Sequence, residues 1–366
     1  MNRFVSASAR HQRIPITIVG GPKAAGKTTL LRQILTSNEG RRIAVAFDQG
    51  IVPPLSPSLI ANARSNALEL SNGSSCLALD GDVGTALSTL RSARDRALPD
   101  HIVVEASATA GPLRMAGYTF LPGFRPGGMI VVVSAPEIEA MHAEGIEPDE
   151  VLGAQLHHAE ILLVNQMDQV RVADRTVVRR WLQQRTSRAR LIESEHCCVP
   201  TAMILGADRD HVPPDAIQAE WSPSFSVSTE ARKQRIVQPR SQDDYRAWLL
   251  STQNPIEAAA FRSWARDLPD SVVRGDGVLR ILGEPSHQFR FECCGRRWSL
   301  CRDEPWTLDA PPGSWISLVG FASRSTAGRA QRELNESFTV DARQSRQHFK
   351  PPLKGSFSRH SFGDQA

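Results

Sequence analysis

The sequence predicts an α/β protein in which a mostly parallel sheet covered by helices is followed by a smaller α+β domain. Two observations predict the first part. Compact apolar runs alternate with amphipathic segments, and a glycine-rich loop joins the first run to a helical segment. A third observation predicts the second part: after residue 207 the chain becomes polar and rich in Pro and Ser, and short alternating strands follow.

The first part is expected to begin with a buried strand and to continue as alternating strands and helices. The run IPITIVG (14–20) is β-branched and apolar and ends in glycine, while KTTLLRQILTS (27–37) has apolar residues at helical spacing. The further expected strands are RRIAVAF (41–47), HIVVEA (101–106), GMIVVVSA (128–135) and AEILLVN (159–165), and the further expected helices are residues 81–98 and 174–189. This alternation predicts a parallel sheet with helices on its faces.

The remaining segments divide the chain into domains and tails. Residues 208–245 are interpreted as a linker and lead-in, so that the first domain spans 14–207 and the second spans 246–338. The elements expected in the second domain are a helix at 255–268, strands at 277–283, 288–295, 296–301 and 314–321, and a closing helix at 327–338. Residues 1–13 are an N-terminal tail, and the basic residues 339–366 are expected to be a disordered tail.

The composition excludes several classes of protein. With 41% hydrophobic and 22% charged residues, the 366-residue chain has the composition of an ordinary globular protein, and no apolar run is long enough to cross a bilayer. The N-terminus lacks the apolar core of a secretory signal and the six cysteines form no CxxC pair, so a cytoplasmic protein without membrane contact is expected. Basic residues are enriched in the C-terminal tail, for which solvation is favoured over contact with nucleic acid or an acidic partner. No specific nucleic-acid binding is predicted.

The segment GPKAAGKT (21–28) satisfies the phosphate-binding pattern GxxxxGK[ST] and lies between an expected strand and an expected helix. Its backbone N–H groups would surround the β-phosphate at the positive end of the helix. Lys27 is expected to reach the β and γ oxygens, the Thr28 hydroxyl to bind Mg²⁺ and Thr29 to contact the α-phosphate. The candidate nucleotide-binding residues of the loop are Gly21, Ala24, Ala25, Gly26, Lys27, Thr28 and Thr29. The sequence therefore predicts a P-loop NTPase domain.

Two acidic residues at strand ends are candidates for the remaining phosphate chemistry. Glu105 closes the run HIVVE, and we expect it to act as a catalytic residue beside Lys27 by orienting Mg²⁺ directly or through a water. A solvent-facing strand-end carboxylate is the alternative for Glu105. Asp48, which follows IAVAF, is a candidate switch residue near the γ-phosphate.

The four residues after the run AEILLV indicate which base is bound. Asn165-Gln166-Met167-Asp168 matches the guanine-reading pattern Asn-Lys-x-Asp except at the lysine. In that pattern the aspartate accepts from guanine N1–H and the exocyclic amine, which adenine cannot reproduce, and the asparagine ties the loop to the phosphate loop. GTP is therefore favoured over ATP, with weaker binding because Gln166 lacks the lysine stem that covers the base. A polar turn without a base contact is the alternative.

The order of these motifs resembles that of the CobW-type GTPases, P-loop proteins related to the urease and hydrogenase metal-insertion GTPases, over about residues 14–338. Besides the phosphate loop, the resemblance is carried by LELSNGSSCLALDGDV (68–83), IVVEASATAGP (102–112), QLHHAEILLVNQMD (155–168), LPDSVVRGDGVLRILG (268–283) and SWISLVGF (314–321). The resemblance implies GTP hydrolysis coupled to delivery of a transition metal, often zinc or cobalt, to a client metalloprotein.

Several positions depart from the family pattern. Where the family usually has Asn-Gly-Cys-x-Cys-Cys, the three thiol positions are Ser74, Cys76 and Leu77, so Cys76 is the one candidate transition-metal ligand left there and cannot by itself make a tight site. The glycine usual after the Walker B acid is Ala108, the aspartate usual after the next strand is Ser134, and the lysine of an Arg-x-Lys-Gly pattern is Asp276. A slow or altered hydrolytic cycle is expected from these losses.

The other cysteines and histidines are not expected to supply ligands. Cys197 and Cys198 are interpreted as buried core residues, His157 and His158 as pointing to different helix faces, and Cys293 and Cys294 as facing opposite sides of a strand.

The predicted function is that of a slow Mg²⁺-dependent GTPase that binds GTP and acts on an unidentified client metalloprotein, with Zn²⁺ or another transition metal as a candidate cargo. Two alternatives stay open. One is a non-catalytic interaction protein whose second domain is positioned by the nucleotide. The other is a P-loop ATPase or small-molecule kinase. The oligomeric state is also left open.

Overall fold

The structure is a computed structural model. It describes residues 13–37, 40–47, 60–64, 67–71, 74–78, 87, 98–106, 116–186, 188–207, 217–220, 245–269, 271–306 and 313–321. Asp48, most of the helix expected at 81–98, the whole helix expected at 327–338 and the C-terminal tail lie outside the described residues. Among the helices that are described, none is long and apolar enough to cross a membrane.

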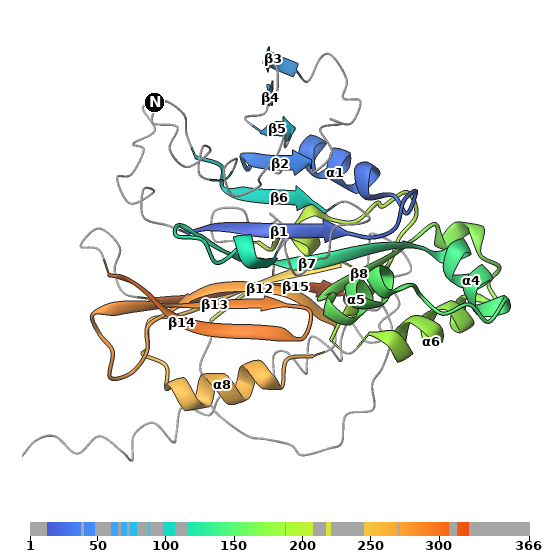
Figure 1. The fold of residues 1–366 in the computed structure, drawn as a ribbon. Helices are drawn as coiled ribbons and strands as arrows, with labels where there is room; N and C mark the ends of the chain where they lie inside the picture. The colour runs from blue at the N-terminus through green and yellow to red at the C-terminus, as the bar shows by residue number, and fades with distance from the viewer. Residues whose placement is uncertain are drawn as a thin grey trace, which may run out of the picture.

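The large sheet has the strand order β3-β4-β5-β2-β6-β1-β7-β8-β9, and its seven strands from β5 to β9 run parallel (Figure 1). The strands are β1 (Ile14–Gly20), β2 (Ile43–Phe47), β3 (Ile60–Arg64), β4 (Ala67–Leu70), β5 (Ser75–Ala78), β6 (His101–Glu105), β7 (Phe124–Ser134), β8 (Ile161–Asn165) and β9 (Arg190–Glu193). β1 lies inside the sheet and all seven of its residues are buried, as its continuous apolar run predicts. The predicted parallel sheet is confirmed.

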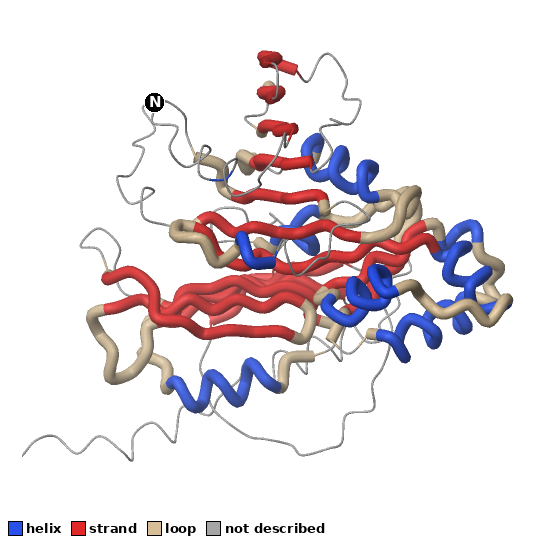
Figure 2. The backbone as a smooth tube through the Cα atoms, in the orientation of Figure 1, coloured by secondary structure: helices blue, strands red, loops and turns tan. Residues whose placement is uncertain are grey.

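Helices cover both faces of the large sheet (Figure 2). They are α1 (Lys27–Thr36), α4 (Ala135–Ala143), α5 (Glu150–His158), α6 (Arg175–Arg185) and α7 (Thr201–Leu205). On one face Ile138, Leu156 and Leu182 from α4, α5 and α6 share a core with the apolar strand residues. On the other face Leu31 and Ile34 of α1 and the buried residues of α7 form a second core. The helices expected at 27–37 and 174–189 are present as α1 and α6.

The second sheet has the order β10-β11-β15-β12-β13-β14 and is antiparallel except between β10 and β11. Its elements are β10 (Ile217–Glu220), β11 (Tyr245–Thr252), α8 (Ala258–Arg266), β12 (Val272–Leu279), β13 (His287–Cys294), β14 (Arg297–Pro305) and β15 (Ser314–Phe321). Val272 and Cys293 lie in the core beneath α8, whereas Val273 and Cys294 lie in the core shared with α1 and α7. The second sheet therefore covers the α1 and α7 face of the large sheet, and Cys293 and Cys294 face opposite sides as predicted.

Two features of the second part were not anticipated from the sequence. The range interpreted as a linker contains β10, and β11 comes before α8 and pairs with both β10 and β15. β12 begins at Val272, earlier than the run expected at 277–283, although Gly275 and Gly277 weaken its strand pattern. A Cβ at Gly277 would lie 2.6 Å from the carbonyl oxygen of Trp315, so the close approach of the neighbouring strand requires glycine there.

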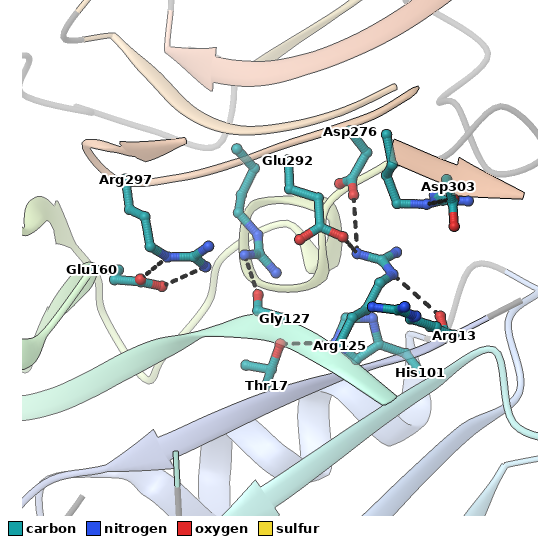
Figure 3. Close-up of polar contacts among 12 residues, drawn as sticks. Arg13, Thr17, His101, Arg125, Gly127, Glu160, Asp276, Glu292, Arg297 and Asp303 are labelled. Atoms are coloured by element: carbon teal, nitrogen blue, oxygen red, sulfur yellow. Dashed lines mark hydrogen bonds and ion pairs between the residues drawn. The ribbon is translucent and has the colours of Figure 1, made fainter. Parts of the chain in front are cut away.

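Polar side chains join the two sheets at the start of β7 (Figure 3). The Arg125 guanidinium of β7 donates to Glu292 of β13 and lies 3.8 Å from Asp276 of β12, so that it sits between two carboxylates. Arg274 of β12, which is buried, donates in turn to the carbonyl oxygen of Gly127. Burial raises the pKa of Asp276 to about 6, against the opposing effect of Arg125 and Arg274.

A second contact between the sheets lies one strand further along. Glu160, which precedes β8, accepts hydrogen bonds from Arg297 of β14 and from the backbone N–H of Met129. A Cβ at Gly128 would lie 2.6 Å from the Cys294 Sγ and 2.8 Å from an Arg274 nitrogen. The second sheet is thus held close to β7 by both apolar and charged contacts.

Candidate nucleotide-binding site

The phosphate loop lies between the end of β1 at Gly20 and the first residue of α1, Lys27. Gly21 and Gly26 have positive φ angles of 133° and 111°, and Ala24 also has a left-handed φ of 61°. A left-handed non-glycine residue costs of order 1 kcal/mol or more, so the surrounding structure must hold Ala24 in place. The loop therefore adopts the turned backbone that the glycine spacing predicts.

The packing around Gly26 leaves no room for a side chain. A Cβ at this position would lie 2.5 Å from the Asn165 Nδ2 and 2.7 Å from the Cys197 Sγ. Gly26 is also the N-cap of α1, and its carbonyl accepts from the Leu30 N–H. The start of α1 is therefore fixed against the loop that follows β8.

The Lys27 side chain is folded over its own loop. Its Nζ donates to the carbonyl oxygens of Gly21 at 2.9 Å and Pro22 at 2.7 Å. Burial lowers the Lys27 pKa, while the carboxylates of Glu105 and Glu137 act in the opposite direction. Glu137 lies in the first turn of α4 and is a second acid near the loop, which no sequence motif indicates.

The two candidate Mg²⁺ ligands come from the first turn of α1 and from the end of β6, the strand beside β1. Thr28 is exposed in the first turn of α1, and Glu105 ends β6, where it lies beside Val19 of β1 in the parallel register. The next residue, Ala106, donates its N–H to the Val19 carbonyl. A hydroxyl and a carboxylate are hard oxygen donors of the kind that Mg²⁺ prefers. The residues present therefore fit Mg²⁺ bound together with a nucleotide.

The candidate base-reading loop after β8 is attached to the phosphate loop through Asn165. The buried Asn165 Nδ2 donates to the Ala25 carbonyl oxygen at 3.0 Å. Its Oδ1 accepts from the Cys197 N–H at 2.8 Å and the Ser194 hydroxyl at 3.3 Å. Asp168, the candidate base-reading residue, is exposed in the short 3₁₀ segment Met167–Gln169 that follows.

The segment from Ser194 to Cys198 is a third part of the candidate site, although its sequence predicts only a buried cysteine pair. His196 and Cys197 both have left-handed backbone, with φ angles of 53° and 56°. Cys197 is buried, as predicted, and its Sγ lies 3.3 Å from the Gly26 carbonyl oxygen. The prediction that Cys198 is buried was wrong, because the turn leaves Cys198 exposed. The segment from Ser194 to Cys198 directly follows the parallel strand β9, and this position was the signal that could have assigned it to the site.

Cys76, the candidate transition-metal ligand, is placed in the core by the structure. Cys76 lies in β5 with no exposed surface, packed in the core with Val45 and Leu70, and burial raises its thiol pKa to about 12. The Ser74 hydroxyl, at the first thiol position of the family pattern, accepts from the Ile43 N–H at 3.2 Å. Within the described ranges, no group of three or more His, Cys, Asp or Glu could hold a metal ion.

In this parallel sheet, the first strand leads through a turned glycine loop into a helix, and a lysine lies over that loop. These features define a P-loop nucleotide-binding protein. Residues 15–193 match the family model described as "CobW/HypB/UreG, nucleotide-binding domain". Over these residues the chain is similar to this family, as a divergent CobW-like protein.

Relatives of established name match different shares of the chain. The zinc chaperone CobW of Sinorhizobium sp is 24% identical over 349 residues, which cover 87% of this chain and 96% of that protein. Zinc-regulated GTPase metalloprotein activator 1 of Schizosaccharomyces pombe is 28% identical over 195 residues, 50% of this chain and 46% of that protein. The crystal structure of Zn(II)-bound YjiA GTPase from E. coli covers 90% of this chain and 100% of its own at 20% identity, with a TM-score of 0.44.

Proposed function

We propose that this chain binds GTP with Mg²⁺, hydrolyses it slowly and uses the cycle to serve a client metalloprotein. The observation that carries the proposal is the Asn165 contact with Ala25, which joins a guanine-reading loop to a phosphate loop. The proposal is supported by the match of residues 15–193 to the CobW/HypB/UreG family model and by relatives named as a zinc chaperone and a GTPase metalloprotein activator.

In this proposal the phosphate loop binds the triphosphate through its backbone N–H groups and Lys27. Bringing the γ-phosphate to Lys27 would move its ammonium from the Gly21 and Pro22 carbonyls to phosphate oxygens. Thr28 and Glu105 would hold Mg²⁺, which supplies positive charge to the β and γ oxygens when bound. Thr29 and the N–H groups of Ala24 and Ala25 would complete the phosphate contacts.

The base would be read by Asp168 and supported by Asn165. The Asp168 carboxylate accepts two hydrogen bonds only from a base that carries adjacent N–H donors, as guanine does. Gln166 stands where the guanine-reading pattern has lysine, so the affinity for GTP is proposed to be moderate. Asp48 and Ala108 lie outside the described residues, and the proposed role of Asp48 as a switch residue rests on its sequence position.

Zinc enters the proposal only as cargo. The burial of Cys76 means that its thiolate is not offered to a metal in this conformation, since the thiolate, not the thiol, is the ligand. We therefore propose that any zinc handled with the client is not bound through Cys76.

The proposal is tested by titrating a fluorescent guanine nucleotide with Mg²⁺ into the wild type, Lys27→Ala and Lys23→Ala. Lys23 is an exposed lysine of the same loop and serves as the matched control. We expect Lys27→Ala to lose about tenfold or more in affinity, the size of a charge-assisted hydrogen bond, and Lys23→Ala to match the wild type. Equal binding by all three proteins, or tighter ATP than GTP binding in competition, would refute the proposal.

A second candidate function is a nucleotide-gated interaction protein without useful turnover. The observation that favours it is that β7 contacts both the second sheet and the phosphate loop. Arg125, near the start of β7, pairs with Glu292 of the second sheet, and Val132, near its end, lies against Gly21. Tight guanine-nucleotide binding with phosphate release at the background rate, unchanged by zinc, would select this function over a GTPase.

A further inference from the structure

Ser134 ends β7 and occupies the N-cap position of α4, yet its side chain makes no capping hydrogen bond to that helix. Serine is favoured at this position because its side chain normally accepts a hydrogen bond from the first turn of the helix. The buried Ser134 side chain makes no such bond, and its hydroxyl donates instead to Gln166 Oε1 at 2.6 Å. The hydroxyl is thus committed to the loop that follows β8.

Gln166 is unusual for a separate reason. Its backbone is left-handed, with φ of 62° and ψ of 30°, although it is neither glycine nor asparagine. It lies between the anchored Asn165 and the 3₁₀ segment that carries Asp168. Such conformations persist only where the surroundings hold them, and they cluster at functional sites.

A single hydrogen bond joins Ser134 and Gln166, the two residues with these unusual local features. Ser134 leaves its helix uncapped and Gln166 keeps a strained backbone, and the hydrogen bond between them fixes the turn that leads from Asn165 to Asp168. Both positions also depart from the family pattern, in which they are aspartate and lysine. A neutral hydrogen bond therefore stands where that pattern would place opposite charges.

We propose that Ser134 is a positioning residue for base recognition: it holds Gln166, and the turn at Gln166 sets the direction of Asp168 relative to the phosphate loop. The inference rests on the proposed binding of GTP. It predicts a contribution to the affinity for the base and none to the affinity for the phosphates, because the Lys27 contacts do not involve Ser134.

The test compares the affinities of GTP, ATP and inorganic pyrophosphate in the wild type, Ser134→Ala and Thr119→Ala. Thr119 is a buried hydroxyl that donates to the Ala116 carbonyl before the start of β7, so its variant controls for the loss of a buried hydrogen bond. We expect Ser134→Ala to lower GTP affinity about fivefold, the value of one neutral hydrogen bond, and to leave pyrophosphate unchanged. Thr119→Ala should change neither affinity.

A second pair of variants tests the route through Gln166. Gln166→Gly accepts the left-handed backbone without strain and removes the group that Ser134 holds. In that background, Ser134→Ala should have no further effect on GTP affinity. An equal loss in both backgrounds, or an equal loss for GTP and pyrophosphate, would overturn the inference. The inference would also be overturned if the wild type prefers GTP to ATP and Ser134→Ala binds GTP as tightly as the wild type does. That outcome would leave the proposed function intact. A wild type with no preference for GTP would refute the proposed function itself.

Discussion

The Asn165 Nδ2 lies 3.0 Å from the Ala25 carbonyl oxygen, across 140 residues of sequence. One side-chain amide thereby connects β8 to the phosphate loop after β1, and its Oδ1 binds the segment after β9. All three loops follow the carboxyl ends of parallel strands, which is where ligands bind in open α/β sheets.

Replacing Asn165 with Ala is expected to weaken both the fold and the nucleotide site. The variant leaves the Ala25 carbonyl and the Cys197 N–H buried without this partner, which costs about 1–3 kcal/mol for each group. Denaturant unfolding should show the loss of stability, and GTP titration the loss of affinity. The exposed Asn254 gives the control variant Asn254→Ala, and equal stability of the two variants would contradict the expectation.

Replacing Asp168 with Asn should change which base is bound. Xanthine carries an oxygen where guanine carries its exocyclic amine, so an amide that donates fits xanthine and a carboxylate that accepts fits guanine. We expect Asp168→Asn to lower GTP affinity and to raise the affinity for xanthosine triphosphate, each by about tenfold or more. Competition binding measures both. An unchanged GTP to xanthosine triphosphate ratio would remove Asp168 from the base site.

The interface residue Asp276 should make stability depend on pH. Its folded pKa of about 6 lies above the ordinary value of 3.8, so the folded state holds its proton more tightly than the unfolded state. The protonated form therefore contributes stability that is fully present below pH 3.8 and is lost as the pH rises through 6. Arg125 and Arg274 favour the charged form and Glu292 opposes it, but burial outweighs the two arginines.

The variant Asp276→Asn keeps a neutral side chain at every pH and isolates this contribution. Its free energy of unfolding, compared with the wild type, should rise between about pH 4 and pH 6 by up to about 3 kcal/mol and then level off. Denaturant unfolding at several pH values measures the difference. The Asp303→Asn variant, at a carboxylate paired with Arg290 in the same sheet, is the control. A difference that falls with rising pH would show that the Arg125 ion pair dominates instead.

Replacing Cys76 with Ser is expected to affect stability and not zinc binding. A hydroxyl placed in the apolar core without a partner costs about 1–3 kcal/mol in protein mutational data, so the unfolding midpoint should fall. Zinc affinity should equal that of the wild type, because the buried thiol is not offered to a metal in this conformation. The exposed Cys198 provides the control variant Cys198→Ser, which should retain stability. A zinc affinity lowered only in Cys76→Ser would show that Cys76 takes part in zinc binding.

The sequence by itself determined the phosphate loop and the apolar runs that form the parallel strands, and it identified Asn165 to Asp168 as a candidate base-reading motif. These are short contiguous patterns, and a strand, a turn and a helix at fixed spacing can be recognised without knowing their neighbours. Helix α8 and the strands β13 to β15 were predictable for the same reason. β10 was missed because a four-residue edge strand in a polar stretch carries little periodic signal.

Only the tertiary structure decided how the separate motifs meet. It placed Cys76 in the core, brought the Cys197 segment to Gly26, and set Asp276 beside Arg125. It also joined Ser134 to Gln166, two residues whose departures from the family pattern had no visible connection. The physical reason is that these contacts are made between residues far apart in the chain. They depend on strand order and on the packing of two sheets, and neither leaves a local pattern in the sequence.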